Sequence, residues 1–315
     1  MTGFVVRRLI VLVGTLFVVS VIAFLVPYVS GSDPARTILR GRVSDFALDS
    51  AAVEAVRLQF GLDQPLYVQY IRWLESAIVG DFGRSFASQV PVIDLVINGL
   101  IVSIILALAA LLLAVVLAVP LGVFAATRAG SRSDTTILLL TQGLVALPEY
   151  WLAPLGILVF ALGLGLLPAA GWLAPESVIL PAAVLSLRPL AYLLGVTRAS
   201  MITVLSSAYI TAARARGLSQ WATLRRHAVK NSMVPVMTLF SIWLAGTLGG
   251  SVVVEVIFSV PGLGRVMYQA VTNGDVPLIQ GGVVAVVALA VVVNTITDIG
   301  YAVLNPAVVV GDSHG

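Results

Sequence analysis

Six long apolar runs dominate the sequence, and they constrain the fold more than any other feature. The runs cover about residues 9–30, 98–127, 135–164, 178–200, 235–257 and 278–304. A helix needs about 20 apolar residues to cross the hydrocarbon core of a bilayer. Only 10% of the residues are charged, whereas soluble domains carry about 25%. The sequence therefore predicts an all-α membrane protein with six transmembrane helices.

Prolines interrupt the third and fourth of these runs. Pro148 and Pro154 lie in the third, and Pro181 and Pro189 lie in the fourth. Transmembrane helices tolerate proline because neighbouring groups satisfy the freed carbonyl groups. We therefore count both runs as spans.

The charges beside the runs predict how the chain is oriented. The first run follows the segment MTGFVVRR, which resembles the start of a signal peptide. The run is longer than the 7–15 residues typical of such peptides, and no A-x-A cleavage site follows it. We therefore expect a retained anchor with its N-terminus in the cytoplasm. Alternation then places residues 31–97, 165–177 and 258–277 outside, and residues 128–134, 201–234 and 305–315 inside.

Arginines support this orientation. Arg7, Arg8, Arg128 and Arg132 all fall in segments assigned to the inside, as the positive-inside rule requires. The net charge of +3 therefore follows from topology and gives no reason to expect nucleic-acid binding.

Four parts follow along the chain. Residues 1–30 hold the N-terminus and the first transmembrane helix, and residues 31–97 form an extracytoplasmic helical subdomain. Residues 98–304 form a five-helix core that includes a cytoplasmic loop at 201–234 and an outer hairpin at 258–277. Residues 305–315 form a cytoplasmic tail.

A basic insert at residues 209–235 separates the fourth and fifth runs. Its cations are Arg214, Arg216, Arg225, Arg226 and Lys230. Cations this close to the ends of transmembrane helices mark a cytoplasmic loop.

Two short helices are expected within the insert. Small residues run up to Gly217, where a helix can end and the chain can turn. Ser219 can cap a second helix, along which Leu218, Trp221 and Leu224 recur about once per turn. Such an element presents an apolar stripe and a basic rim to a cytosolic partner. The alternative is a loop that is basic only because it lies inside.

The insert resembles the EAA loop of ABC-importer permeases, in the form found in the dipeptide/oligopeptide/nickel permease family. That form typically reads Y-x-R-T-A-R-A-K-G-L, followed by R-H-A-L-x-N-x-L-L-P-V. The matching residues here are Tyr209, Ala213, Arg214, Ala215, Arg216, Gly217 and Leu218, followed by Arg226, His227, Ala228, Asn231, Pro235 and Val236. The general EAA signature places Glu near Thr211 and Pro near Lys230, so the match is to the peptide branch and not to the generic motif. Within that branch the chain resembles the B-type subunit. The resemblance implies ATPase coupling through Ala213, Arg214, Ala215, Arg216, Gly217, Leu218, Ser219, Trp221, Leu224, Arg226 and His227.

Outer segments extend the resemblance to nearly the whole chain. Residues 60–66, 70–74 and 80–85 are similar to the family's L-G-L-D-x-P-x-x-x-Q-Y and G-D-L-G-x-S strings, and we read them as short amphipathic helices separated by turns. The family's E-x-x-F-x-x-P-G-L-G string is matched by Glu255, Phe258, Pro261, Gly262, Leu263 and Gly264. Pro-Gly and the later Asn273-Gly274-Asp275 are turn signals. We therefore expect a re-entrant outer hairpin, which Glu255 pins in place.

The sequence lacks the residues that catalysis or a bound metal would need. Its only lysine, Lys230, does not lie in a P-loop. His227 and His314 are too few for a histidine metal cluster, and there is no cysteine. We expect no catalytic residue, metal or cofactor in this chain. ATP and magnesium belong, by the same resemblance, to separate ATPase subunits.

Two charged residues depart from the family pattern inside the predicted spans, where ionisable side chains are costly and often functional. Glu149 follows Pro148, where the family usually has a small hydroxyl residue, as in P-S-F. Arg188 appears in the fourth run, in which Gly195 replaces the arginine usually found three residues before Arg198. At 1.5 Å per residue, Glu149 and Arg188 lie about 21 and 15 Å from the inner ends of their runs. We hypothesise that they meet and face the translocation cavity. The alternatives are a pair that only staples two helices, or charges that never meet.

The resemblance implies a type I ABC-importer permease fold and the permease subunit of an ATP-driven importer of di- or oligopeptides. It implies a second homologous permease, two ATPase domains and an extracytoplasmic substrate-binding protein, all at the cell membrane, with alternating access as the mechanism. A nickel or metal-chelate importer of the same architecture is an alternative. A non-ABC secondary carrier would need inverted repeats, which we do not find in the sequence.

Overall fold

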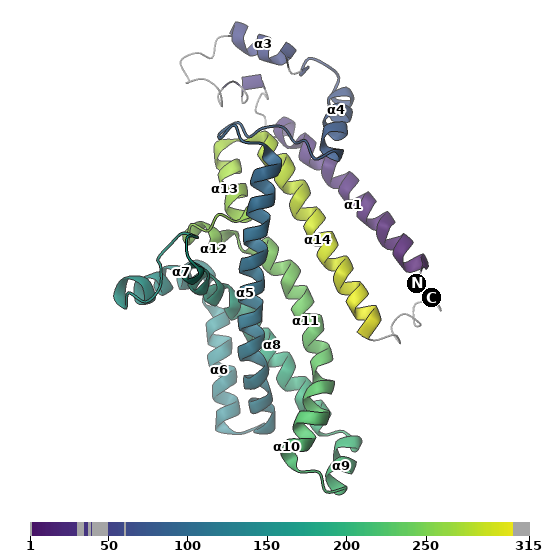
Figure 1. Cartoon of the computed structure of the whole chain (residues 1–315), viewed down its shortest axis with the longest axis vertical. Coiled ribbons are helices and arrows are strands. Elements are labelled where there is room, and N and C mark those ends of the chain that lie inside the picture. The colour runs from purple at the N-terminus through teal and green to yellow at the C-terminus, as the bar shows by residue number, and fades with distance from the viewer. Residues whose placement is uncertain (1, 30–34, 37–38, 40–49, 60, 305–315) are drawn as a thin grey trace. The chain divides into compact units, whose positions relative to one another are not determined.

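The computed structural model describes residues 2–29, 35–36, 39, 50–59 and 61–304, and it is helical almost throughout (Figure 1). Within this part of the chain, the only β-type pairing is an isolated antiparallel bridge between Arg84 and Pro91. The predicted cytoplasmic tail at 305–315, and most of the first half of the predicted outer subdomain, lie outside the described residues. The all-α class is confirmed.

Five helical stretches in the described residues are long and apolar enough to cross a membrane. They are α1 (Thr2–Val29), α5 (Val92–Thr127), η3 with α8 (Pro175–Val178 and Ile179–Leu205), α11 (Val229–Gly250) and α14 (Val276–Leu304). A sixth candidate is a broken pair formed by α6 (Arg132–Ala146) with α7 and η2 (Glu149–Gly156 and Ile157–Gly163). Counted as one span, this pair gives the predicted six.

The broken pair bends by 98° between its two halves. Leu147 at the break is extended, with φ −83° and ψ 127°, because a residue before proline is pushed out of the helical region. Pro148 then begins α7. In contrast, Pro181 and Pro189 lie within α8 and do not break it. Pro181 is in the first turn, where the missing N–H has no helical partner to lose.

The fifth predicted run is displaced toward the N-terminus. The sequence predicts a span at 235–257, but α11 ends at Gly250 and a separate short helix, α12 (Val252–Ile257), follows. The polar residues Lys230 and Asn231 belong to the first turn of α11, so hydropathy alone places the start too late.

The chain forms two compact units. Unit 1 comprises residues 1–103 and 261–295, and unit 2 comprises residues 104–260 and 296–315. The long helix α5 contributes to both units.

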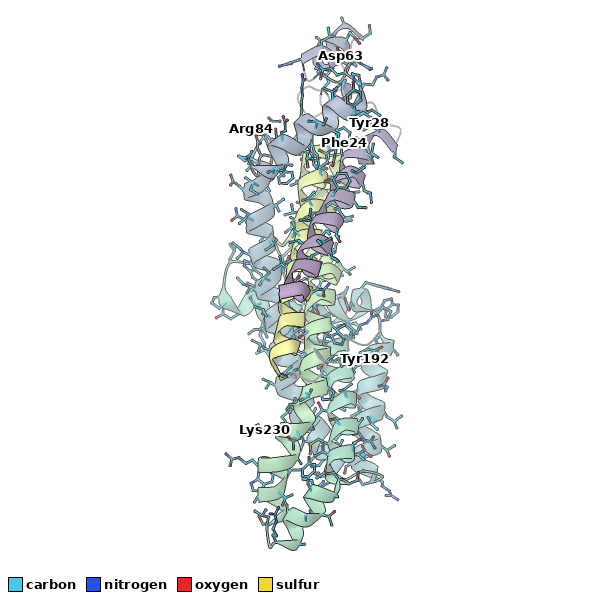
Figure 2. All side chains as sticks on the ribbon, turned by 90° about the vertical axis from the view of Figure 1, so that its right-hand side faces the viewer. Phe24, Tyr28, Asp63, Arg84, Tyr192 and Lys230 are labelled. Atoms are coloured by element: carbon cyan, nitrogen blue, oxygen red, sulfur yellow. The ribbon has the colours of Figure 1, made fainter. Side chains whose placement is uncertain are left out.

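Unit 1 contains α1, α3 (Ser50–Gln59), α4 (Leu66–Ile78), α13 (Leu263–Asn273) and the first parts of α5 and α14. Its core includes Val92, Val96 and Leu263. Phe24 of α1 (Figure 2) packs against the rings of Tyr70 and Trp73 in α4, with centroids 5.4 and 6.1 Å away.

The predicted short outer helices are only partly present. Residues 70–74 lie within α4, and residues 61–64 form a turn. Residues 80–85 are not helical, which contradicts the prediction. Gly80 and Gly83 adopt φ values of +84° and +79°, a region that ends a helix rather than extends one.

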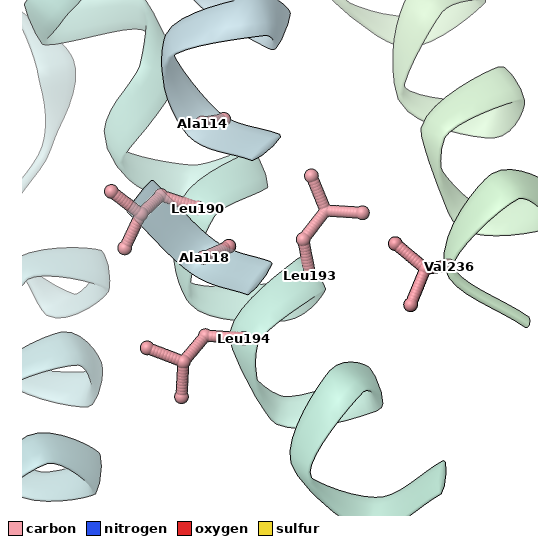
Figure 3. Packing of buried hydrophobic residues seen from close by; sticks show 6 residues of the cluster. All are labelled: Ala114, Ala118, Leu190, Leu193, Leu194 and Val236. Atoms are coloured by element: carbon pink, nitrogen blue, oxygen red, sulfur yellow. The ribbon is translucent and has the colours of Figure 1, made fainter. Parts of the chain in front are cut away.

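Unit 2 contains α6 to α12 and the remaining parts of α5 and α14. Its core is built around α8, whose Leu190, Leu193 and Leu194 pack against Ala114 and Ala118 of α5 and Val236 of α11 (Figure 3). Helices α5 and α8 approach closely at Gly122, where a Cβ atom would lie 2.7 Å from Cβ of Thr197. Small residues allow this kind of close helix packing in membranes.

Candidate functional site

The basic insert begins with α9 (Ala208–Ala215), which ends at the predicted glycine. Gly217 has φ +86°. Its N–H donates to the carbonyl of Arg214 at 2.9 Å, and the N–H of Leu218 donates to the carbonyl of Ala213 at 3.3 Å. These are the two hydrogen bonds of a Schellman motif, which satisfies the last carbonyls of a helix. The predicted helix end at Gly217 is confirmed.

Ser219 caps the following helix, as predicted. The N–H of Ala222 donates to Oγ of Ser219 at 3.2 Å, and the N–H of Thr223 donates to its carbonyl at 2.9 Å. The helix differs from the prediction in its length. From α10 (Gln220–Thr223) it continues through a π-helical turn, η4 (Leu224–Ala228), into α11. A movement of the insert therefore acts directly on a candidate transmembrane helix.

The predicted apolar stripe does not face one way. Leu224 is buried in a cluster with Ala126 of α5, Met201 of α8 and Ile210 of α9, whereas Trp221 is 69% exposed. The prediction of a single apolar stripe that faces a partner is wrong, because Leu224 instead packs against residues of α5, α8 and α9. Trp221 remains available for contact.

The exposed side of the insert is strongly basic. We define the insert surface as Arg214, Arg216, Trp221, Arg225 and Lys230, all of which are exposed; Figure 2 labels Lys230. Ala215, Gly217 and Ser219 are exposed beside them, whereas Leu218 is half-buried and Ala213 is buried. The side chains of Arg226 and His227 lie outside the described part of the structure. The insert thus combines a buried apolar attachment with an exposed cationic face.

The structure brings Glu149 and Arg188 together. Nε of Arg188 lies 3.8 Å from Oε1 of Glu149, with the two side chains 49% and 22% exposed respectively. Both residues line a cavity of about 270 Å³ within unit 2, together with residues of α11. The possibility that these charges never meet is therefore wrong.

The residues of the predicted outer hairpin fall into the two units. Glu255 and Phe258 belong to unit 2 and are buried. Oε1 of Glu255 accepts a hydrogen bond from Ser251 at 2.7 Å, and the carbonyl of Phe258 accepts one from the N–H of Gly171 at 2.8 Å. Glu255 therefore lies in the first turn of α12, where it bonds to the residue that precedes its own helix.

Pro261, Gly262 and Gly264 belong to unit 1. Gly262 precedes α13, and the N–H of Leu263 donates to Oγ of Ser103 at 2.9 Å. Gly274 ends α13 with φ +66°. The turn predicted at Asn273-Gly274-Asp275 is confirmed, whereas no turn forms at Pro261-Gly262, where Gly262 is extended with φ −84° and ψ 170°. An 11-residue helix separates the two places, so this stretch is not a simple hairpin of turns.

One ion pair was missed by the sequence reasoning. Arg198 of α8 binds Asp134 of α6 through two hydrogen bonds, Nε to Oδ1 at 2.6 Å and Nη2 to Oδ2 at 2.7 Å. The same carboxylate accepts a hydrogen bond from the N–H of Gly130 at 2.9 Å. The spacing Ser131-x-x-Asp134 is that of a capping box, which could have identified Asp134 as a structured residue.

Asp275 is a second missed residue. It is buried, and its carboxylate accepts hydrogen bonds from Oγ of Ser85 at 2.5 Å and from the N–H groups of Phe86 and Ala87 at 3.1 and 3.3 Å. It fastens the loop after α4 to the start of α14 within unit 1. In the sequence Asp275 marked only a turn.

The described residues hold no group of three or more His, Asp or Glu side chains placed to bind a metal ion. Charged side chains in this part of the chain are found on the exposed insert surface and at the cavity lined by Glu149 and Arg188.

Comparisons with known proteins identify the family. Residues 118–310 match the binding-protein-dependent transport system inner membrane component, and residues 1–109 match the N-terminal part of such membrane components. The chain is 35% identical over 308 residues to the glutathione transport system permease proteins of Escherichia coli (strain K12) and Shigella dysenteriae serotype 1 (strain Sd197). Each alignment covers 98% of this chain and 99% of the relative.

Proposed function

The chain belongs to the binding-protein-dependent transport system inner membrane components, the permease subunits of ABC importers, and from this premise we propose that it carries short peptides or peptide-like solutes into the cell. As a member of this family it is a multi-pass membrane permease and not itself an enzyme. The family works with a partner permease, ATPases and a binding protein.

The proposed solute class rests on the relatives and on the insert. The relatives are named for transport of glutathione, a tripeptide, and the insert has the form typical of peptide permeases. The proposed assembly has a second homologous permease, two ATPase domains that bind ATP and magnesium, and an extracytoplasmic binding protein. Both termini of this chain lie in the cytoplasm in this arrangement.

The observation that carries the proposal is that the insert has an exposed cationic face and a buried apolar attachment. Its exposed face is cationic and bears Trp221, while Leu224 and Ile210 attach it to Ala126 and Met201 near the ends of α5 and α8. An ATPase that binds the exposed face would move the insert when it closes on ATP. Because the insert is continuous with α11 and packed on α5 and α8, that motion reaches the membrane helices and opens the pathway outward.

Transport in right-side-out vesicles tests this function. The vesicles contain the co-expressed complex, with ATP inside and the binding protein and labelled dialanine outside. We expect accumulation that requires both the ATPases and ATP. Accumulation driven by a proton or sodium gradient without the ATPases would identify a secondary carrier, and uptake of a nickel chelate without uptake of peptides would overturn the solute class.

A further inference from the structure

Two arginine–carboxylate pairs join α8 to the broken third span, and their geometries differ. Arg198 and Asp134 are joined by two hydrogen bonds of 2.6 and 2.7 Å, and the Asp134 side chain is 3% exposed. Arg188 and Glu149 approach only to 3.8 Å, and the Arg188 side chain is 49% exposed. A separation of 3.8 Å is too long for a hydrogen bond. One pair is closed and the other is open.

Proline restricts the backbone on both sides of the second pair. Glu149 is the first residue of α7, directly after the break at Pro148, and Arg188 directly precedes Pro189 in α8. Proline fixes its own φ and restricts the residue before it. Both side chains therefore project from restricted backbone positions, and their own rotatable bonds can adjust the 3.8 Å gap to a ligand.

The open pair lies at a cavity of about 270 Å³. On the α11 side the cavity is lined by Trp243, Gly246 and Gly250, and the two glycines carry no side chain that would fill it. Trp243 is held by the ring of Tyr192, with centroids 5.4 Å apart. The cavity thus offers one carboxylate, one guanidinium and an aromatic wall.

This set of groups selects a particular class of solute. The guanidinium of Arg188 is suited to bind a carboxylate, and Glu149 is suited to accept hydrogen bonds from an ammonium group. A zwitterion keeps the cavity neutral, whereas a solute with one charge leaves a protein charge without a partner in a weakly polar site. Small-molecule sites usually have volumes from about 300 Å³ upward, so this cavity is at the small end.

We propose that the cavity is a binding site for dipeptide-sized zwitterions in the permease itself, with Arg188 binding the C-terminal carboxylate and Glu149 the N-terminal ammonium. This inference rests on the proposed function, since it assigns a recognition step to the solute that the importer carries. It adds a second point of selection after the binding protein, and it makes Glu149 and Arg188 specificity residues instead of a staple.

Binding to the purified permease–ATPase complex without the binding protein tests the site. The probes are dialanine, N-acetyl-dialanine and dialanine amide, measured by calorimetry. Wild-type protein is expected to bind dialanine about tenfold or more tightly than either blocked form, because each blocked form loses one of the two charge-assisted contacts. Equal binding of the three probes, or no binding of dialanine, overturns the proposal even if no variant can be purified.

Two variants test which residue binds which terminus of the peptide. Arg188→Gln is expected to bind the amide and the free acid about equally while it still rejects the acetylated form, and Glu149→Gln is expected to show the opposite pattern. Asp134→Asn is the matched control, since it weakens the closed pair and should lower the melting temperature without a change in preference. If the Arg188 and Glu149 variants behave like this control, the pair is a staple.

The uptake assay separates this inference from the proposed function. ATP-driven uptake of dialanine with no discrimination between the probes rejects the zwitterion site alone. Uptake that needs no ATPase rejects the proposed function, whatever the binding results show.

Discussion

Gly217 illustrates what single residues decide in this protein. Its φ of +86° sets the turn of the insert, and no atom lies within 4 Å of a Cβ placed there, so only the backbone torsion requires glycine. Sequence alone could predict this residue and the cap at Ser219, because helix ends depend on local chemistry. The different burial of Trp221 and Leu224 could not be predicted, because Leu224 is buried by α5 and α8, which are distant in sequence.

The effect of replacing Gly217 on uptake should therefore depend on how readily the new residue adopts a positive φ. Gly217→Val places a β-branched residue in the left-handed region, which costs about 1–2 kcal/mol or more, and should reduce ATP-driven uptake about tenfold or more. Gly217→Asn should retain most uptake, because Asn adopts this region more readily. Uptake in vesicles, with membrane levels measured alongside, checks this.

Gly143 provides the control for that comparison. It lies in α6, has no positive φ, and no atom lies within 4 Å of the point that a Cβ would occupy. Gly143→Val should leave uptake nearly unchanged. Equal uptake by Gly217→Val and Gly143→Val would show that the turn does not matter for coupling.

At the scale of elements, the packing depends on close helix contacts and on buried side-chain hydrogen bonds. The six apolar runs predicted the spans because a bilayer imposes length and hydropathy directly. The 98° bend of the third span was not predicted, since hydropathy is continuous through Leu147 and proline is often tolerated in membrane helices. The contact of α5 with α8 at Gly122 and the hydrogen bonds of Asp275 were not predicted either, because they join residues far apart in sequence.

The α5–α8 contact predicts that alanine substitutions at two glycines change the stability of the protein differently. Gly122→Ala places a methyl group 2.7 Å from Thr197, and overpacking of this kind costs about 1–3 kcal/mol. Its melting temperature in detergent should fall. Gly143→Ala should be neutral or stabilising, by about 0.5–1 kcal/mol, because alanine is the better helix former. A lower melting temperature for Gly143→Ala than for Gly122→Ala would contradict the assigned contact.

The hydrogen bonds of Asp275 predict that nearby backbone amides are protected from hydrogen exchange. Asp275→Ala removes the acceptor for Ser85, Phe86 and Ala87, and hydrogen bonds to charged groups contribute about 1.5–3 kcal/mol. Hydrogen exchange at the amides of residues 86 and 87 should accelerate about tenfold or more. Glu75→Ala changes an exposed carboxylate in α4 and should leave these amides unchanged. Unaltered exchange in Asp275→Ala would show that other contacts hold the loop.

At the scale of the whole molecule, the proposed orientation follows from the arginines, and the absence of cysteine makes it testable. Tyr67 of α4 is 68% exposed, and Thr211 of α9 is also exposed. Tyr67→Cys should react with a membrane-impermeant maleimide in intact cells, whereas Thr211→Cys should react only after permeabilisation. The opposite pattern would invert the topology. The division into two units was not predictable from hydropathy, because α5 and α14 each contribute residues to both.

The central claim is that the insert couples this permease to an ATPase. Cross-linking tests it most directly, with Thr211→Cys as the only cysteine and a reagent that joins a thiol to an amine. In membranes that transport dialanine with ATP, we expect an adduct between Thr211→Cys and the ATPase subunit, in a yield that changes with ATP, and none from Tyr67→Cys. A transport-active complex that gives no adduct from Thr211→Cys, or an equal adduct from Tyr67→Cys, would contradict the claim.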